Sequence, residues 1–396
     1  MTEGVLSGIR VLDYGRYVAG PYCATLLGYL GAEVIRVERR DGGEDRFIAP
    51  LATTGEGAVF LQTACNKKSL TLDPTTDQGR EITAKLIATA DVIVANLPAA
   101  SLRAMGLDYD SVRAIRPDCI LATQSAFGDQ GPYANRGGFD GVGQAMSGAM
   151  YMTGVPGAPA KSAAPYVDFS TAVLSAFGVL AALLERGRSG RGQRVDATLL
   201  GTALAVFNSH LVEQSVARPN RVGTGNRVQT SAPSDVFATR DGHVLLHCVG
   251  NGLFRRWARL MGDEARWLGD PRYGSDQSRA DHADDILART REWCAERTTD
   301  AAIRELEAAG VPAGPVQTLQ QALDDPQVTA MGFLRPVDFP GLPQPAMVAD
   351  LPVRLSGTPG GIRERPPRLG EHTDAILGEL GYDAGAIHAL RAAGVV

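Results

Sequence analysis

The chain has no surplus of basic residues: 39 Lys and Arg stand against 44 Asp and Glu, and the formal net charge is -5 at pH 7. Proteins that bind nucleic acid usually carry a strongly basic surface. We therefore expect no nucleic-acid partner. The charge does not exclude a small anionic ligand, because one local basic site can hold a phosphate on an acidic protein.

Cysteine is scarce, and its pattern argues against paired thiols. The spacing is wide, with no C-x-x-C and no Cys–His pair at the spacing of metal ligands. An odd number of dispersed cysteines is typical of free thiols in a reducing compartment. We predict no disulfide and no metal site from the five, which are Cys23, Cys65, Cys119, Cys248 and Cys294.

Two kinds of hydrophobic segment are missing from the sequence. The N-terminus shows no charged region followed by an apolar run, as a signal peptide would. No stretch approaches the roughly 20 apolar residues that a membrane span needs. These absences predict a cytoplasmic protein without membrane contact.

What is present is a regular alternation of elements. The first 125 residues alternate short β-rich runs with helical patterns, which is typical of a parallel sheet with crossover helices. We predict strands at 9–14, 33–38, 91–95 and 119–124, and helices at 21–31, 77–89 and 169–186. Residues 205–232 are polar and poorly periodic, which indicates a linker. A second unit follows, with a hairpin of strands 236–239 and 243–249 around Asp241-Gly242 and helices near 254–261, 285–295 and 300–308.

The turn after the first strand resembles a mononucleotide-binding unit. It runs Gly15-Arg-Tyr-Val-Ala-Gly20, with Glu38 at the end of the next strand, where a ribose-binding acid would lie. The glycines are spaced G-x4-G, whereas a dehydrogenase fingerprint needs G-x-G-x-x-G. A ligand site and a plain βαβ turn both remain open. Arg39 and Arg40 follow that strand, either as a phosphate site or as a solvated pair.

An acid precedes the long apolar segment of the middle of the chain. Asp168 can accept backbone N–H bonds at a helix start, where the helix dipole favours the ionised form. The residues alone favour this N-cap interpretation. A carboxylate that is ionised near neutral pH can also attack a thioester carbonyl without a base. Asp140 is a second acid nearby in sequence, with a turn aspartate as its structural alternative.

Taken together, these segments resemble the class III CoA-transferases of the CaiB/BaiF type, the family of formyl-CoA transferase and carnitine CoA-transferase. The resemblance covers almost the whole chain. It rests on Leu12-Asp-Tyr14, Ala19-Gly-Pro21, residues 31–39 and 66–73, Asn96, residues 128–133, Phe139-Asp140, and residues 189–196, 309–316 and 369–374.

The resemblance implies an architecture. It comprises a large doubly wound, Rossmann-like parallel-sheet α/β domain from residues 1–204 and 330–396, a linker at 205–232, and a smaller α+β domain at 233–329. Two such chains would form a homodimer of interlocked rings. Gly250-Asn-Gly252 then corresponds either to a family glycine loop over the active site or to a plain turn.

The resemblance also implies roles. Asp168 becomes the nucleophile, with Asp140 beside it, and the substrates are an acyl-CoA and a carboxylic acid, so coenzyme A enters as a substrate and no metal is needed. Succinyl-CoA, a common donor in the family, is the first expectation. Arg103 lies one residue from Ala104, where the family has an arginine. The expected coenzyme A contacts are Val18, Ala19, Arg39, Leu72, Asn96, Leu97, Arg103 and Phe139.

Three alternatives remain beside this reading. A 2-methylacyl-CoA racemase shares the fold but needs a proton-transfer group, usually a histidine, where this chain has Phe139. An NAD-dependent dehydrogenase would use the first βαβ unit. A non-catalytic acyl-CoA-binding protein would have no use for the retained Asp168.

Overall fold

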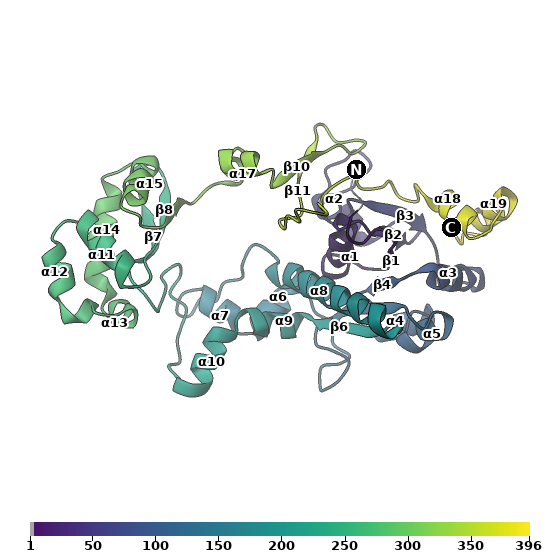
Figure 1. Ribbon diagram of the computed structural model, residues 1–396, viewed down its shortest axis with the longest axis horizontal. Helices are drawn as coiled ribbons and strands as arrows, with labels where there is room; N and C mark the ends of the chain where they lie inside the picture. The colour runs from purple at the N-terminus through teal and green to yellow at the C-terminus, as the bar shows by residue number, and fades with distance from the viewer. Residues whose placement is uncertain (1–3) are drawn as a thin grey trace. The chain divides into compact units, whose positions relative to one another are not determined.

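The computed structural model describes residues 4–396, and six strands from the first half of the chain form one sheet (Figure 1). Every strand is parallel to its neighbours, in the order β3-β2-β1-β4-β5-β6. The four predicted strands are confirmed, with ends that differ by a few residues. The bounds are β1 Arg10–Asp13, β2 Glu33–Glu38, β3 Lys67–Thr71, β4 Val92–Ala95, β5 Ile120–Ser125 and β6 Arg194–Thr198.

Helices cover both faces of this sheet, because successive strand residues are apolar and point to opposite sides. Val11, Val34 and Ile120 face helices α1 (Ala19–Tyr29) and α8 (Tyr166–Ser189). Their neighbours Leu12, Ile35 and Leu121 face the opposite layer. That layer consists of α3 (Asp77–Thr89), α4 (Ala99–Ala104), α5 (Tyr109–Ile115), α18 (Thr373–Glu379) and α19 (Ala384–Ala392). The predicted α/β class with a parallel sheet is confirmed.

The C-terminal segment covers the outer edge of β3. The Ser69 N–H donates to His372 Nδ1 at 3.2 Å, and the His372 N–H donates to the Ser69 carbonyl at 3.0 Å. The Thr71 N–H donates to Thr373 Oγ1 at 3.1 Å. The C-terminal segment is therefore hydrogen-bonded to the edge of the sheet. This part of the fold also contains α2 (Ala58–Thr63), α17 (Pro326–Met331) and the antiparallel pair β10 (Leu334–Val337) and β11 (Ala346–Ala349).

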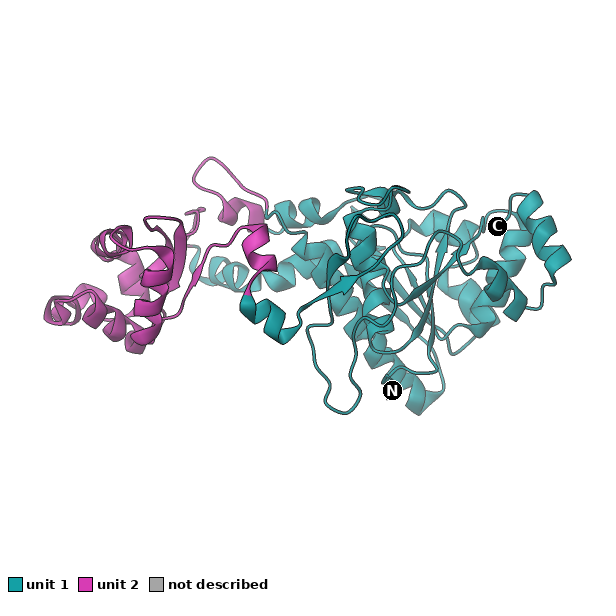
Figure 2. Ribbon diagram, turned by 90° about the horizontal axis from the view of Figure 1, so that it is seen from above, with its two compact units in different colours: residues 1–148, 162–218, 326–396 teal, residues 149–161, 219–325 magenta. Residues whose placement is uncertain are grey.

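The chain divides into two compact units, coloured separately in Figure 2. The first comprises residues 4–148, 162–218 and 326–396, and the second comprises 149–161 and 219–325. The predicted ranges placed 149–161 in the large domain, whereas here the Gly225 N–H bonds to the Gly154 carbonyl at 2.9 Å within the second unit.

A three-stranded antiparallel sheet and a set of helices make up the second unit. The predicted hairpin is confirmed as β7 (Ser234–Ala238) and β8 (His243–His247), which β9 (Ala313–Pro315) extends. Its core gathers the three tryptophans, Trp257, Trp267 and Trp293. The helices include α7 (Ala149–Thr153), α11 (Asn251–Leu260), α12 (Glu264–Gly269), α13 (Asp276–Asp281), α14 (Ala283–Ala295), α15 (Thr299–Ala308) and α16 (Leu319–Leu323).

Two segments differ in structure from what the sequence suggested. The predicted linker at 205–232 contains a helix, α10 (Asn208–Ala217), which follows α9 (Leu199–Val206). No residue of α10 is buried. The helix therefore needs no apolar face, and its sequence lacks the regular spacing of apolar residues that predicts a helix. The prediction that no stretch reaches membrane-span length also fails, since α8 is long and apolar enough. It packs against α1, β5 and β6.

Candidate functional site

The sheet order places a topological switch point between β1 and β4, where the chain connections leave in opposite directions. In such folds, ligands bind outside the carboxyl ends of the strands at this point. Asn96 follows β4 and holds the turn that follows β1. Its Oδ1 accepts a bond from the Arg16 N–H at 2.6 Å, and its Nδ2 donates to the Arg16 carbonyl at 2.7 Å. The two loops at the switch point are therefore tied together.

The glycines of this turn serve close packing. A Cβ atom at Gly15 would lie 2.6 Å from Pro21 Cδ and 2.7 Å from Asp13 Oδ1. A Cβ atom at Gly20 would lie 3.0 Å from Asn96 Oδ1. The G-x4-G spacing is thus explained by the approach of α1 to its own turn and to Asn96.

Asp168 lies in the first turn of α8, but it does not cap the helix. Pro165 occupies the N-cap position, and the exposed backbone donors bond to Asp140 instead. Asp140 Oδ1 accepts from the Val167 N–H at 2.8 Å and from the Asp168 N–H at 3.1 Å. Gln144 Nε2 donates to Asp140 Oδ2 at 2.5 Å. The interpretations of Asp168 as an N-cap and of Asp140 as a turn aspartate are both wrong.

The Asp168 carboxylate is left without a donor by this arrangement. Its residue is 9% exposed, and across residues 4–396 no hydrogen bond to either carboxylate oxygen is seen. Burial raises the pKa of Asp168 to about 6, and the charge of Asp140 adds to the rise. The sequence predicted that the helix start would stabilise the ionised form of Asp168, but burial and the charge of Asp140 outweigh that effect. At pH 7 such a group is still about 90% ionised.

The start of α8 lies at the carboxyl edge of the sheet. Val167 packs in one apolar cluster with Ala19, Leu199 and Ala126, which follow β1, β6 and β5. Val18, the N-cap residue of α1, is 8% exposed and next to Ala19. The structure thus brings the predicted residues Val18 and Ala19 next to the segment that carries Asp168.

Phe139 precedes α6 (Asp140–Met146) and exposes 61% of its surface. Its ring meets that of Tyr17 edge-to-face, with 5.3 Å between centroids. Sequence reasoning did not single out Tyr17, although it lies in the recognised turn between Gly15 and Val18. Its positive φ of 61° is a property of the folded backbone that the residue type does not suggest.

The other predicted coenzyme A residues lie at the same edge but differ in availability. Arg39 follows β2 and pairs with Glu44 at 3.1 Å and Asp41 at 3.4 Å. Leu72 follows β3 and is 1% exposed within the core, and Leu97 packs partly buried against that core. Arg103 is exposed on α4, and among the described residues no carboxylate pairs with it.

Charged side chains fill the interior beside β1, β2 and β3. Lys67 Nζ lies 2.7 Å from Asp13 Oδ2, and Arg46 Nη2 lies 2.5 Å from Glu38 Oε1. Burial alone would raise the pKa of Glu38, but Arg36 and Arg46 outweigh it and hold that pKa at about 2. Glu38 is 1% exposed, so it cannot hold a ribose, and this interpretation is wrong.

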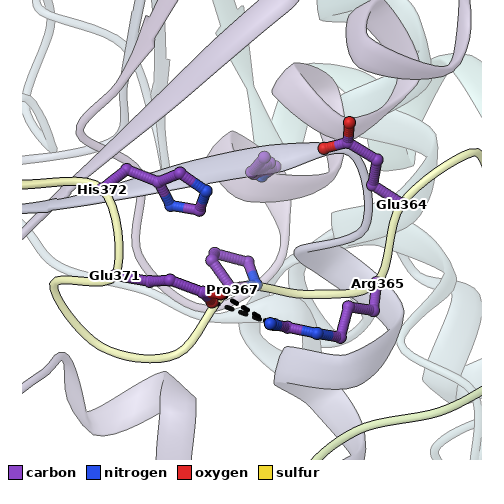
Figure 3. Close-up of a pocket in the computed structure, with 6 residues that line it drawn as sticks. Glu364, Arg365, Pro367, Glu371 and His372 are labelled. Atoms are coloured by element: carbon purple, nitrogen blue, oxygen red, sulfur yellow. Dashed lines mark hydrogen bonds and ion pairs between the residues drawn. The ribbon is translucent and has the colours of Figure 1, made fainter. Parts of the chain in front are cut away.

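A cavity of about 300 Å³ lies beside Lys67 (Figure 3). It opens beside the covered edge of β3, and Arg365 Nη2 pairs with Glu371 across it at 2.6 Å. None of the predicted site residues contributes to its wall. The lining consists of Lys67, Glu364, Arg365, Pro367, Glu371 and His372. Among the residues described, no group of three or more His, Cys, Asp and Glu side chains is placed to hold a metal ion.

Comparison with known proteins identifies the family. Residues 6–373 match the model of CoA-transferase family III. The succinate–glutarate CoA-transferase of Agrobacterium fabrum is 33% identical over 394 residues, and the alignment covers 95% of each chain. The succinyl-CoA:mesaconate CoA-transferase of Haloarcula marismortui is also 33% identical, with 96% of this chain and 98% of that protein covered. A crystal structure of a CaiB/BaiF family protein from Brucella suis superposes with a TM-score of 0.84 at 31% identity, over 96% of this chain and all of that one. The chain therefore belongs to CoA-transferase family III.

Proposed function

We propose that the protein moves coenzyme A from an acyl-CoA donor to a carboxylic acid through covalent intermediates on Asp168. The observation that carries this proposal is the state of the Asp168 carboxylate. It is buried, accepts no hydrogen bond from the described residues and has a pKa of about 6, so at neutral pH it is ionised and poorly solvated. A carboxylate in this state is a stronger nucleophile than one stabilised by backbone donors.

The first half-reaction loads coenzyme A onto the enzyme. An Asp168 oxygen attacks the thioester carbonyl, the C–S bond breaks, and a mixed anhydride and CoA thiolate form. The thiolate then attacks the Asp168 carbonyl of the anhydride. This step releases the first carboxylate and leaves an aspartyl-CoA thioester.

The second half-reaction reverses these steps with a new acid. The incoming carboxylate attacks the aspartyl thioester and forms a second anhydride, with CoA thiolate as the leaving group. The thiolate attacks the acyl carbonyl of that anhydride, which gives the new acyl-CoA and restores the Asp168 carboxylate. Each step exchanges one activated acyl bond for another, so the cycle needs no ATP and no general base.

The relatives suggest the class of substrate. Their names include succinate–glutarate and succinyl-CoA:mesaconate transferases, and these acids are dicarboxylates. We infer that succinyl-CoA is the donor and that the acceptor is a short dicarboxylic acid. Coenzyme A would lie along the carboxyl ends of β1, β2 and β4, with Val18, Ala19, Asn96 and Leu97 beside it.

The two arginines differ in how they would meet the phosphates of coenzyme A. Arg39 would have to leave Glu44 and Asp41 to bind a phosphate. Arg103 pairs with no carboxylate within residues 4–396, so it could bind a phosphate without first breaking an ion pair. This supports Arg103 as the replacement for an arginine at the position of Ala104.

We further propose that the chain acts as a homodimer of interlocked rings. Two features of the first unit support an extensive interface. Helix α10 buries none of its residues, and Val212 and Val216 on it are 54% and 81% exposed. Along α8, Phe177 and Leu184 are 69% and 75% exposed. Apolar surface of this extent is typical of a face that a partner covers. A monomeric mass in native mass spectrometry at micromolar concentration would refute the dimer.

The racemase and dehydrogenase alternatives fit the site less well. A racemase needs proton-transfer groups at the reacting carbon, and Phe139, which meets Tyr17 here, carries no exchangeable proton. A dehydrogenase would need a free acid for the ribose, and Glu38 is fully paired with arginines.

Asp168→Ala tests the catalytic role. We expect loss of transfer, with coenzyme A affinity kept within a few-fold, because the affinity comes from the nucleotide. Asp300→Ala is the matched control, since Asp300 is also a first-turn acid of a helix but is exposed, and it should keep wild-type activity. Hydroxylamine added during turnover should leave a hydroxamate on Asp168, visible by peptide mass spectrometry. Substantial turnover by Asp168→Ala, or an unmodified peptide from active enzyme, would overturn the proposal.

A further inference from the structure

The turn after β1 holds a tyrosine in a backbone conformation that suits glycine. Tyr17 has a φ of 61°, in the left-handed region where a side chain at Cβ is strained. Strained positions of this kind persist only where the surroundings fix them, and they concentrate at functional sites. Here the backbone of the neighbouring residue Arg16 is fixed by the side-chain amide of Asn96, whose Oδ1 accepts from the Arg16 N–H at 2.6 Å and whose Nδ2 donates to the Arg16 carbonyl at 2.7 Å.

The strained backbone places the Tyr17 ring against Phe139. Their centroids are 5.3 Å apart and the rings are nearly perpendicular, at 87°, which is a favourable edge-to-face contact. The pair joins two segments that are far apart in sequence, the turn after β1 and the residue before α6. A glycine at position 17 would adopt the same backbone without strain but would supply no ring.

The same two segments flank the start of α8. Ala19, two residues after Tyr17, packs in one cluster with Val167. Asp140, the residue after Phe139, accepts the backbone bonds of Val167 and Asp168 at 2.8 and 3.1 Å. The aromatic pair therefore bridges the two segments that position the Asp168 carboxylate.

We propose that Tyr17 and Phe139 form a shield that keeps water from the covalent intermediates on Asp168. The inference rests on the proposed function. Water that attacks the aspartyl thioester breaks the C–S bond and gives the Asp168 carboxylate and free CoA thiol, with one water consumed. Water that attacks the anhydride gives the Asp168 carboxylate and a free acid. Both reactions waste the donor, and exclusion of water by apolar side chains slows them relative to transfer.

The test compares two rates in one preparation. The first is the release of CoA thiol from succinyl-CoA without an acceptor acid, and the second is acyl-CoA formation with the acceptor that the wild-type enzyme uses fastest. Tyr17→Ala and Phe139→Ala should each raise the ratio of hydrolysis to transfer by about tenfold or more. The double variant should raise it no further than the stronger single variant, because either change opens the same shield.

Two further variants separate the shield from effects on folding. Tyr17→Phe keeps the ring and should keep the wild-type ratio. Tyr17→Gly relieves the backbone strain and removes the ring, so it should fold at least as well as Tyr17→Ala and still hydrolyse the donor. Tyr133→Ala is the matched control, because Tyr133 makes a comparable contact with Phe127 at 5.6 Å and should leave the ratio unchanged.

The outcomes are distinguishable. A wild-type enzyme that transfers no CoA to any acid, in a screen of acyl-CoA donors against mono- and dicarboxylic acids, would overturn the proposed function itself. A wild-type enzyme that transfers CoA, with Tyr17→Gly and Phe139→Ala slowing hydrolysis and transfer in equal proportion, would overturn the shield alone. A raised ratio in Tyr133→Ala equal to that of Tyr17→Ala would also overturn it, because the effect would then not belong to this pair.

Discussion

Replacing Asp168 by asparagine should make the protein more stable while it abolishes transfer. Burial raises the pKa of the Asp168 carboxyl from 3.8 to about 6. The folded state therefore holds its proton more tightly than the unfolded state does, and ionising the group at neutral pH opposes folding. A pKa difference of this size corresponds to about 3 kcal/mol. Asparagine has the same shape and no charge, so it removes that cost.

The sign and the pH dependence of this effect follow from linkage. Stability contributed by a protonated Asp168 is present below pH 3.8 and is lost as the pH rises through about 6. The free energy of unfolding of Asp168→Asn should thus exceed that of the wild type by about 3 kcal/mol at pH 8 and by about half of that at pH 5. In a unit of this size, the larger gain corresponds to a rise in melting temperature of about 5 °C.

The assay must report on the unit that contains α8. The three tryptophans lie in the second unit, so their fluorescence follows that unit and serves as the internal reference. Hydrogen exchange of the α8 amides in urea, measured at pH 8 and, with rates corrected for intrinsic exchange, at pH 5, reports on Asp168. A variant no more stable than wild type at pH 8 would refute the reasoning, and so would a gain at pH 5 as large as the gain at pH 8.

Three other predictions follow from the same contacts. The value of kcat/KM should fall tenfold per pH unit below about 6, as Asp168 becomes protonated, and a profile flat to pH 5 would contradict its role as the nucleophile. Asp140→Ala should lower the free energy of unfolding by about 3 kcal/mol, because three accepted hydrogen bonds are lost, and urea denaturation measures this. Lys67→Ala leaves Asp13 buried without its cation and should lower the free energy of unfolding by about 3–5 kcal/mol. Lys68 pairs with Glu33 near the surface, so Lys68→Ala should change the free energy of unfolding by less than about 1 kcal/mol. Equal losses in the two lysine variants would refute the argument.

The sheet was predictable where its strands are apolar on both faces, as in Val11-Leu12 and Ile120-Leu121. Strand β3 was not predictable as a strand, because Lys67 and Ser69 are polar in type and become buried only through partners from other segments. Helix α10 was missed because its residues bury nothing within the chain.

In the candidate site, too, features set by adjacent residues were predictable and features set by distant residues were not. The residues alone favoured Asp168 as the N-cap of its own helix, whereas the backbone donors at the start of α8 bond to Asp140, 28 residues earlier in the chain. Cap rules consider only adjacent residues, so they assign the nearest acid. Tyr17 could not be found by residue type, since its place in the site depends on a backbone conformation that Asn96 holds from 80 residues away.

The pairing of the C-terminal segment with β3 has a consequence for biosynthesis. Lys67–Thr71 leaves the ribosome roughly 300 residues before His372 and Thr373, which bond to its free backbone groups. At typical elongation rates of about 5–20 residues per second, this edge waits roughly 15–60 s for its cover. An unpaired edge strand can template association with other chains. A nascent protein of this design is therefore open to association during translation, and we expect ribosome stalling near residue 360 to increase its aggregation.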